Sequence, residues 1–338
     1  MKATNQVSKT RLFRRERNNH PMVLSASSIN SFQTCQRMFY YDKVKHIHPT
    51  EKSDALDFGS VVHKGLECIF RWLTFEQSEK EAVRQYAFQD ALIEASERSL
   101  SQEDWAKAKA LLDAYIDLYF DEDKALFDVV EVEKRFTNDV RSPKSKSGEC
   151  YKVQGYWDAV IRNRMTDEYW VIEHKTAGVV TDGYLQRVNI DLQSMMYIEA
   201  VKQKYGSCAG VIYDVIKKPK HEMQTGETDE EFEARKAASK TGRVKRKVGE
   251  SLTEFYNRVR AAVDDGYLIR QMVTPQPAIA EEFKSELYAT CRQINRTKTF
   301  CKCTCNCLKY GTCEYMDLCC NAGNLYGLED KYSVDAPF

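Results

Sequence analysis

Two short stretches decide the fold: Gly155-Tyr156-Trp157-Asp158 and, shortly after it, Val171-Ile172-Glu173-His174-Lys175. Both lie in segments that alternate in polarity and are rich in Val, Ile, Tyr and Trp, which is typical of strands. Because side chains alternate across a strand, Glu173 and Lys175 project from the same face. The sequence therefore predicts neighbouring strands that carry an acid, a second acid and a lysine.

The segment between the two stretches, 163–167, predicts a hairpin turn. If the turn centres between Met165 and Thr166, Asp158 lies directly opposite Glu173 in an antiparallel pair. Two carboxylates that face each other across a sheet repel, so a sequence that places them there usually supplies a cation between them. Hard oxygen ligands suit Mg²⁺ or Mn²⁺. This pairing predicts a metal site.

The chemistry of such a site follows from its parts. A cation between Asp158 and Glu173 can bind a phosphate oxygen and lower the pKa of a bound water. Lys175 can orient that water or stabilise the charge that builds up in the transition state. The pattern predicts phosphodiester hydrolysis with these three residues as the catalytic set. The alternative is a surface salt bridge, because Glu-x-Lys is common on exposed strands.

The elements around this pair favour an α/β domain. Ser28 is a candidate N-cap for a helix that runs to about Lys43. Apolar residues at helical spacing predict two helices within 78–120: Leu92, Leu111, Leu112, Tyr115 and Leu118. The remaining expected elements are helix 55–75, strands 127–136, 151–161 and 168–175, helix 183–205, strand 209–216, helix 251–263, strand 267–273 and helix 278–295. This order predicts one mixed central sheet flanked by helices.

Bulk composition excludes several classes of protein. The 338 residues carry a net charge of +0, so the chain is not a uniformly basic DNA-coating protein, although a groove needs only local positive charge. The sequence holds no long apolar span, no secretory leader and no P-loop, so we expect a cytoplasmic protein without a motor of its own. Two local basic clusters are candidate phosphate contacts or solvated loop charge: 217–220 and 243–247.

Cysteine usage is unusual for such a chain. Seven of the 12 cysteines fall between Cys301 and Cys320. A disulfide framework is one interpretation, but without a secretory leader clustered cysteines more often hold a metal or an iron–sulfur cluster.

Taken in order, the motifs resemble those of PD-(D/E)XK nucleases of the RecB/AddB type, including CRISPR-adaptation exonucleases and phage nucleases. The resemblance spans roughly Ser25 to Cys320. Its parts are the opening helix Ser25-Ala26-Ser27-Ser28-Ile29-Asn30-Ser31-Phe32-Gln33-Thr34-Cys35, then Gly59-x-x-x-His63, Gly155-x-x-Asp158, Glu173-x-Lys175 and Gln193-x-x-x-Tyr197. Glu173 stands where the family usually has Asp, which lengthens the side chain and keeps its charge.

The resemblance implies specific roles. The fold would be restriction-endonuclease-like, and Mg²⁺ or Mn²⁺ would be bound by His63, Asp158, Glu173 and the backbone carbonyl of His174. Gln193 and Tyr197 would contact DNA near the site, and we add Lys245, Arg246 and Lys247 as candidate phosphate contacts. A [4Fe–4S] cluster, with Zn²⁺ as the alternative, would be held by Cys35, Cys307, Cys313 and Cys319. The residues alone leave an alternative for two of these positions. His63 could have a purely structural role instead of binding metal, and Tyr197 could be a core residue instead of a DNA contact.

These patterns together predict a metal-dependent DNA nuclease, specifically an exonuclease on single-stranded or end-bearing DNA. Its expected setting is recombination, repair or phage DNA metabolism in a bacterial or phage-infected cell, with a separate helicase or recombination protein as partner and no membrane. The alternative is a catalytically silent iron–sulfur or zinc module that binds nucleic acid. The expected organisation is a disordered basic arm over 1–20, a nuclease domain over 21–320 (helical segment 55–120, mobile insert 217–250, cysteine cluster 301–320) and a tail over 321–338.

Overall fold

The computed structural model describes residues 21–50, 54–144, 148–239, 244–264, 266–309 and 311–335; the predicted arm 1–20 lies outside them. The strands are β1 (Val23–Leu24), β2 (Ile47–Pro49), β3 (Phe127–Val140), β4 (Tyr151–Asn163), β5 (Tyr169–Ala177), β6 (Gly210–Lys217), β7 (Leu268–Val273) and β8 (Tyr332–Val334). The α-helices are α1 (Ala26–Thr34), α2 (Gln36–Phe39), α3 (Asp54–Leu73), α4 (Lys80–Glu97), α5 (Gln102–Leu126), α6 (Asp182–Arg187), α7 (Leu192–Tyr205), α8 (Asp229–Ala238), α9 (Leu252–Ala262), α10 (Pro277–Arg296) and α11 (Met316–Cys320).

The predicted mixed central sheet is confirmed. Its strand order is β1-β4-β5-β6-β7, and β3 pairs with β4 along nearly its whole length. The β5–β6 pair is parallel, whereas the β3–β4, β4–β5 and β6–β7 pairs are antiparallel. The hairpin between β4 and β5 turns where the sequence predicts. The side chain of Asn163 accepts hydrogen bonds from the backbone N–H groups of Met165 and Thr166 and thereby shapes the turn.

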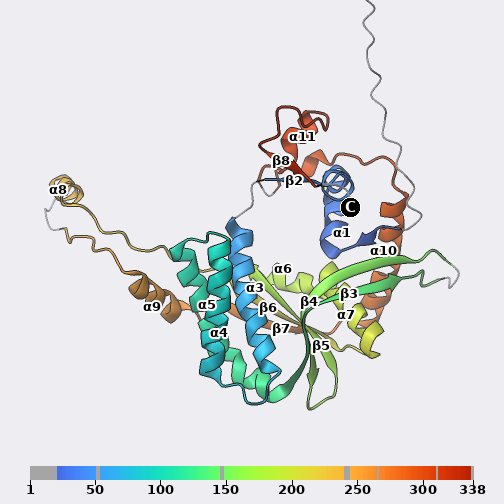
Figure 1. The fold of residues 1–338 in the computed structure, drawn as a ribbon, viewed down its shortest axis with the longest axis horizontal. Coiled ribbons are helices and arrows are strands. Elements are labelled where there is room, and N and C mark those ends of the chain that lie inside the picture. Colours follow the sequence, from blue (N-terminus) through green and yellow to red (C-terminus); the bar gives the residue numbers. More distant parts are fainter. Residues whose placement is uncertain are drawn as a thin grey trace, which may run out of the picture.

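Helices cover both faces of the sheet (Figure 1). One face packs against α3, α4, α5 and α9 in a core that contains Ile172 and Ile212. The other face packs against α1, α7 and α10 in a core that contains Val171 and Val215. Leu92 and Leu118, expected to be apolar contacts of the helical segment, are instead about half exposed, because they lie on the outer faces of α4 and α5.

Two predicted helix boundaries are wrong. The first helix begins one turn earlier than expected, because its N-cap is Ser25 and not Ser28. The hydroxyl of Ser25 accepts from the backbone N–H of Ser28, and the hydroxyl of Ser28 accepts from the backbone N–H of Ser25. That helix also ends at Cys35, whose backbone is extended (φ −160°, ψ 112°), so it does not run continuously to Lys43. The backbone N–H of Arg37 is bonded to the carbonyl of Cys301 in the tail.

The helix expected over 183–205 is likewise interrupted. Asp191 has an extended backbone (ψ 128°) and caps α7 by accepting a bond from the N–H of Ser194. Thr181 caps the short α6 in the same way. Both caps let the chain bend after β5, so that α7 returns along the sheet beneath Glu173 and Lys175.

The described residues of the predicted insert 217–250, which follows β6, form a structure that projects away from the body (Figure 1). It is called the arm below and is distinct from the N-terminal segment 1–20. Two extended stretches lead to and from α8 at its tip, and they are joined by backbone hydrogen bonds from Glu227 to Lys247 and from Glu250 to Gln224. No helix among the described residues is long and apolar enough to cross a membrane.

Candidate metal centre and active site

The site begins at a gap in the sheet beside β4. Because β3 occupies one edge of β4 throughout, β1 and β5 share the other edge: β1 pairs at Lys152–Val153, and β5 pairs only from Ala159 onward. Asp158 lies just before the β5 ladder. Its carboxylate takes the place of a backbone partner and accepts a hydrogen bond of 2.6 Å from the N–H of His174. The ladder ends at the Ala159–Ile172 pair and does not include Asp158 and Glu173, so their direct opposition stays a prediction.

Helix α3 brings His63 over this gap. A Cβ on Gly59 would lie 2.8 Å from the hydroxyl oxygen of Thr176 on β5, so glycine allows the helix to approach the sheet closely. One turn later, the Nδ1 atom of His63 lies 3.8 Å from a carboxylate oxygen of Asp158. Gly59-x-x-x-His63 therefore has a physical basis: a close helix–sheet contact followed by an imidazole aimed at the acid.

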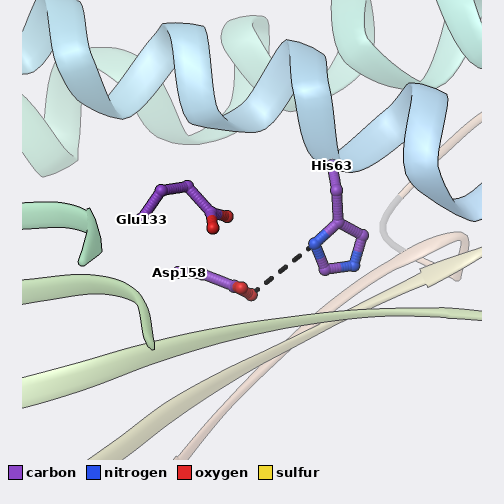
Figure 2. A group of neighbouring side chains, drawn as sticks. All are labelled: His63, Glu133 and Asp158. Atoms are coloured by element: carbon purple, nitrogen blue, oxygen red, sulfur yellow. Dashed lines mark ion pairs between the residues drawn. The ribbon is translucent and has the colours of Figure 1, made fainter. Parts of the chain in front are cut away.

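Glu133 is a site residue that the sequence did not single out. Ligand atoms of His63, Glu133 and Asp158 all lie within 4.8 Å of one another, and Figure 2 shows the three side chains converging from α3, β3 and β4. Glu133 lies between residues paired with Ala159 and Trp157, hence opposite Asp158. The β3 pattern predicted a strand, but its register against β4 could not be fixed from sequence, since the connection between them is long.

Glu173 and Lys175 lie on the other face of β5, toward α7. The exposed fraction of Glu173 is 1%, and its carboxylate is paired with the ammonium of Lys175. That ammonium donates to the Gln193 side chain (3.0 Å), which in turn donates to the Tyr197 hydroxyl (2.8 Å). A Cβ on Gly155 would come within 2.9 Å of the Tyr197 ring, so Gly155 allows that ring to pack on β4.

The side chain of His174 points to the opposite face and contacts a buried charged network. Its Nδ1 lies 3.3 Å from Asp158, and its Nε2 lies 3.4 Å from the hydroxyl of Tyr115. Tyr115 donates to Asp214 (2.7 Å), and Arg270 binds both of them. This network holds the His174 ring, and through it one side of Asp158, in place.

Burial and neighbouring charge shift the acidity of the site. Burial raises the pKa of Glu173, and the nearby charge of Asp158 raises it further, with Lys175 opposing both. Burial also disfavours ionised Asp158, but the hydrogen bond from His174 and the positive charges around it outweigh burial, so the pKa of Asp158 is lowered. Burial lowers the pKa of His63, which favours the neutral imidazole that can act as a ligand. Burial raises the pKa of Glu133 to about 7.

These residues fit a divalent cation. The three ligands that converge are two carboxylates and an imidazole, a donor set that accepts Mg²⁺ or Mn²⁺. Among the described residues, the ammonium of Lys175 is the one partner that the structure gives the buried carboxylate of Glu173. Glu173 is not a member of the group within 4.8 Å, because its carboxylate is turned to Lys175. The imidazole of His63 contacts the backbone of His174, whose carbonyl is a ligand by the resemblance.

A cavity of about 570 Å³ opens over the converging ligands. Its walls include Lys64 and Thr176, and its rim carries two exposed apolar side chains, Leu56 and Tyr156. The cavity therefore gives an outside molecule access to the carboxylate of Asp158.

The cysteines predicted to act together also lie close to one another. The thiols of Cys307, Cys319 and Cys35 all act electrostatically on that of Cys313. Cys303 is near this group as well, since its N–H donates to the sulfur of Cys35 (3.4 Å). All twelve cysteines are free, and three of the tail cysteines are exposed: Cys301, Cys305 and Cys320.

The predicted phosphate contacts lie on the arm. Arg246 forms an ion pair with Asp229 of α8, while the backbone carbonyl of Lys245 accepts from Arg235 and the backbone N–H of Lys247 donates to Glu227. Arg243 of the same cluster lies outside the described residues. In the second cluster, Lys218 pairs with Asp104.

The pairing of Glu173 with Lys175 generates a prediction about cation binding. Glu173→Gln should weaken Mn²⁺ binding, because it removes a charged oxygen ligand. Because the pKa of Glu173 is raised, cation binding must release its proton, so wild-type affinity should rise with pH above the ordinary titration range of a glutamate. That rise should flatten in Glu173→Gln, and calorimetry across pH measures it.

Lys175→Ala should leave Mn²⁺ affinity undiminished, since the ammonium competes with the cation for Glu173. Lys152→Ala, which removes a surface lysine paired with Asp139, is the matched control. Equal affinity and an equal pH profile in wild type and Glu173→Gln would remove Glu173 from the cation site.

Comparison with known proteins identifies the family of this chain. The PD-(D/E)XK nuclease superfamily matches residues 23–320. Among solved structures, the chain is similar to a candidate exonuclease from Eubacterium rectale (11% identity, 99% of this chain and 97% of that one, TM-score 0.46). It is also similar to the protein SSO0001 (13% identity, 65% and 75% covered, TM-score 0.29). A search of curated proteins found no match. Because the family match spans most of its length, this chain belongs to the PD-(D/E)XK nuclease superfamily.

Proposed function

We propose that this protein is a Mg²⁺- or Mn²⁺-dependent deoxyribonuclease of the RecB/AddB type that acts as an exonuclease on single-stranded or end-bearing DNA. The observation that carries the proposal is the convergence of His63 and Asp158 on one cavity, with Glu173 and Lys175 on the adjoining strand. Membership of a nuclease superfamily supports hydrolysis of a phosphodiester.

In this proposal each residue has a separate task. A bound cation would supply Lewis acidity and a water of lowered pKa. His63, Asp158, Glu173 and the carbonyl of His174 would hold that cation. Lys175 would orient the water or stabilise charge on the phosphate as it is attacked. Gln193 fixes the Lys175 ammonium by a hydrogen bond and is the DNA-facing candidate, with the buried Tyr197 behind it.

The setting we propose is recombination, repair or phage DNA metabolism in the cytoplasm, with a separate helicase or recombination protein where duplex DNA must be opened. The second candidate function, a silent iron–sulfur or zinc module that binds nucleic acid, is favoured by the grouped cysteines. The complete set Asp158, Glu173 and Lys175 disfavours it, because loss of catalysis commonly removes one member of such a set.

The test is cleavage of end-labelled linear and circular single-stranded and duplex DNA with Mn²⁺. We expect linear strands to shorten while circular strands survive. Asp158→Ala should abolish cutting, and Lys175→Ala should slow the single-turnover step by roughly 10²–10³, the effect of losing one transition-state donor. Lys152→Ala should cut as wild type does. Uncut DNA under all conditions, with tight DNA binding retained, would favour the silent module.

The arm supplies further DNA contacts in this proposal. One of its extended stretches carries Lys245, Arg246 and Lys247. When DNA binds, Arg246 would leave its weak surface ion pair with Asp229 and contact a phosphate instead. Replacing all three with Gln should flatten the dependence of DNA affinity on salt by about 0.7–0.9 in slope per lost contact. Replacing Lys43, Lys80 and Lys331, which lie on the body, is the control. An unchanged slope in the arm variant would show that these charges are only solvated.

The cysteine group holds a [4Fe–4S] cluster in this proposal, with Cys35, Cys307, Cys313 and Cys319 as ligands. Zn²⁺ is the alternative occupant of this group, because it uses the same four thiolate ligands.

Anaerobically purified protein should therefore be brown, with the broad visible absorbance of thiolate-bound iron. Cys35→Ala should bleach the colour and lower solubility before it lowers cutting, because Cys35 joins the first helix to the tail. Cys301→Ala and Cys320→Ala should keep the colour, since both side chains are exposed. Colourless protein with one tightly bound Zn²⁺ would show that these cysteines bind zinc and not a cluster. Colour that survives Cys307→Ala would show that Cys307 is not a ligand.

A further inference from the structure

The rim of the cavity over Asp158 carries a tyrosine that the proposed chemistry does not use. Tyr156 and Asp158 are two residues apart on β4, so their side chains project from the same face of the strand. The residue between them, Trp157, projects from the other face, where it is fully buried and stacks on Phe136 with ring centroids 4.9 Å apart. Tyr156, in contrast, is 55% exposed and lines the cavity. An aromatic ring is therefore open to an outside molecule next to the carboxylate of Asp158.

Helix α3 forms the facing wall of this cavity, and Figure 2 shows His63 projecting from it toward Asp158. Leu56, Gly59 and His63 recur at helical spacing, which places them on one face of α3, and all three line the cavity. Leu56 is 68% exposed, so the rim has one apolar side chain on α3 and one on β4. The cavity of about 570 Å³ lies within the range of sites for small organic molecules, roughly 300–1,000 Å³.

The charges of the walls do not favour a phosphate. Among the described residues, the cavity is lined by the carboxylates of Glu67, Glu94, Glu133 and Asp158. Lys64 lines it as well, but its ammonium donates to Glu67 (3.0 Å). A DNA backbone is therefore attracted here only by a bound cation, and further affinity must come from the base. Aromatic side chains supply such affinity, because every base has a π-face that can stack on a ring.

The same face of the sheet carries a cation beside Tyr156. Arg135 on β3 is the register partner of Tyr156, so the two side chains project from the same face. Arg135 is exposed, and its guanidinium donates to the side chain of Gln154, the next residue of that face on β4. A DNA strand that leaves the cavity over Tyr156 thus meets a guanidinium, which suits the phosphate of the neighbouring nucleotide.

We infer that Tyr156 stacks on an unpaired base of the DNA strand whose phosphate lies at Asp158, and that Leu56 borders this base from α3. A base within a duplex must leave its stack and its pairing partner to reach the ring, which costs free energy. The site therefore selects single strands. The inference rests on the proposed nuclease function and adds a residue that determines its substrate class.

The test removes either partner of the stack. Single-stranded oligonucleotides with one abasic nucleotide, moved stepwise past the scissile phosphate, are cut by the full chain with Mn²⁺ under single-turnover conditions. At one position we expect the half-saturating DNA concentration of wild type to rise roughly tenfold, the size of one lost base stack, with the maximal rate unchanged. Tyr156→Ala should show the same rise with intact DNA and no further rise with the abasic strand. Its preference for single strands over duplex should fall by the same factor.

Two variants serve as controls. Tyr156→Phe keeps the ring and should behave as wild type. Tyr326→Ala removes another exposed tyrosine, which lies in the tail (82% exposed), and should also behave as wild type. The inference fails if no abasic position weakens binding by wild type. It also fails if Tyr156→Ala and the abasic strand weaken binding independently, because the side chain then only shapes the cavity.

A second readout needs no cutting. An oligonucleotide with iodouracil at the same position cross-links on irradiation to an aromatic ring stacked on it. In Lys175→Ala, which slows cutting and leaves the cavity walls in place, we expect an adduct that mass spectrometry maps to Tyr156. The adduct should be absent when Tyr156→Ala is added. An adduct on DNA that is never cut would reject the nuclease and keep the inference, whereas cutting without an adduct at Tyr156 would do the reverse.

Discussion

The hydrogen bond from the N–H of His174 to the carboxylate of Asp158 is the contact on which the site depends. It replaces a backbone bond at the point where the ladder between β4 and β5 ends. Because a buried N–H must find an acceptor, the carboxylate is drawn between the strands and held there. A single bond thereby ends the sheet pairing, orients the acid and lowers its pKa against the cost of burial.

The rest of the protein holds the two partners of that bond in place. On one side, the His174 ring meets Tyr115 and Asp214, which Arg270 joins to Asp123 in a buried network of charge. Removing one member of such a network leaves another buried charge without its partner, which is costly. On the other side, α7 supports Lys175 through Gln193. Helices far apart in sequence thus act on neighbouring residues of one strand.

The tail has a comparable role for the first helix. Arg37 is bonded to the backbone of Phe300 and Cys301, and Phe39 stacks on Phe300 with ring centroids 6.0 Å apart. Strands β2 and β8 pair next to a small core that includes Tyr41 and Tyr315. The first helix and the tail therefore pack against each other near the grouped cysteines.

The sequence by itself determined the order of the elements, the mixed sheet, the turn at Asn163 and the family, because alternation, helical spacing and short motifs are local properties of a chain. The glycines of two of these motifs could be recognised but not explained: only packing reveals that Gly59 makes room for Thr176 and Gly155 for Tyr197. The tertiary structure alone decided that Glu133 meets His63 and Asp158, and that the first helix breaks at Cys35. Both depend on contacts between segments distant in sequence, where a strand register or a tail carbonyl overrides the local preference of the backbone.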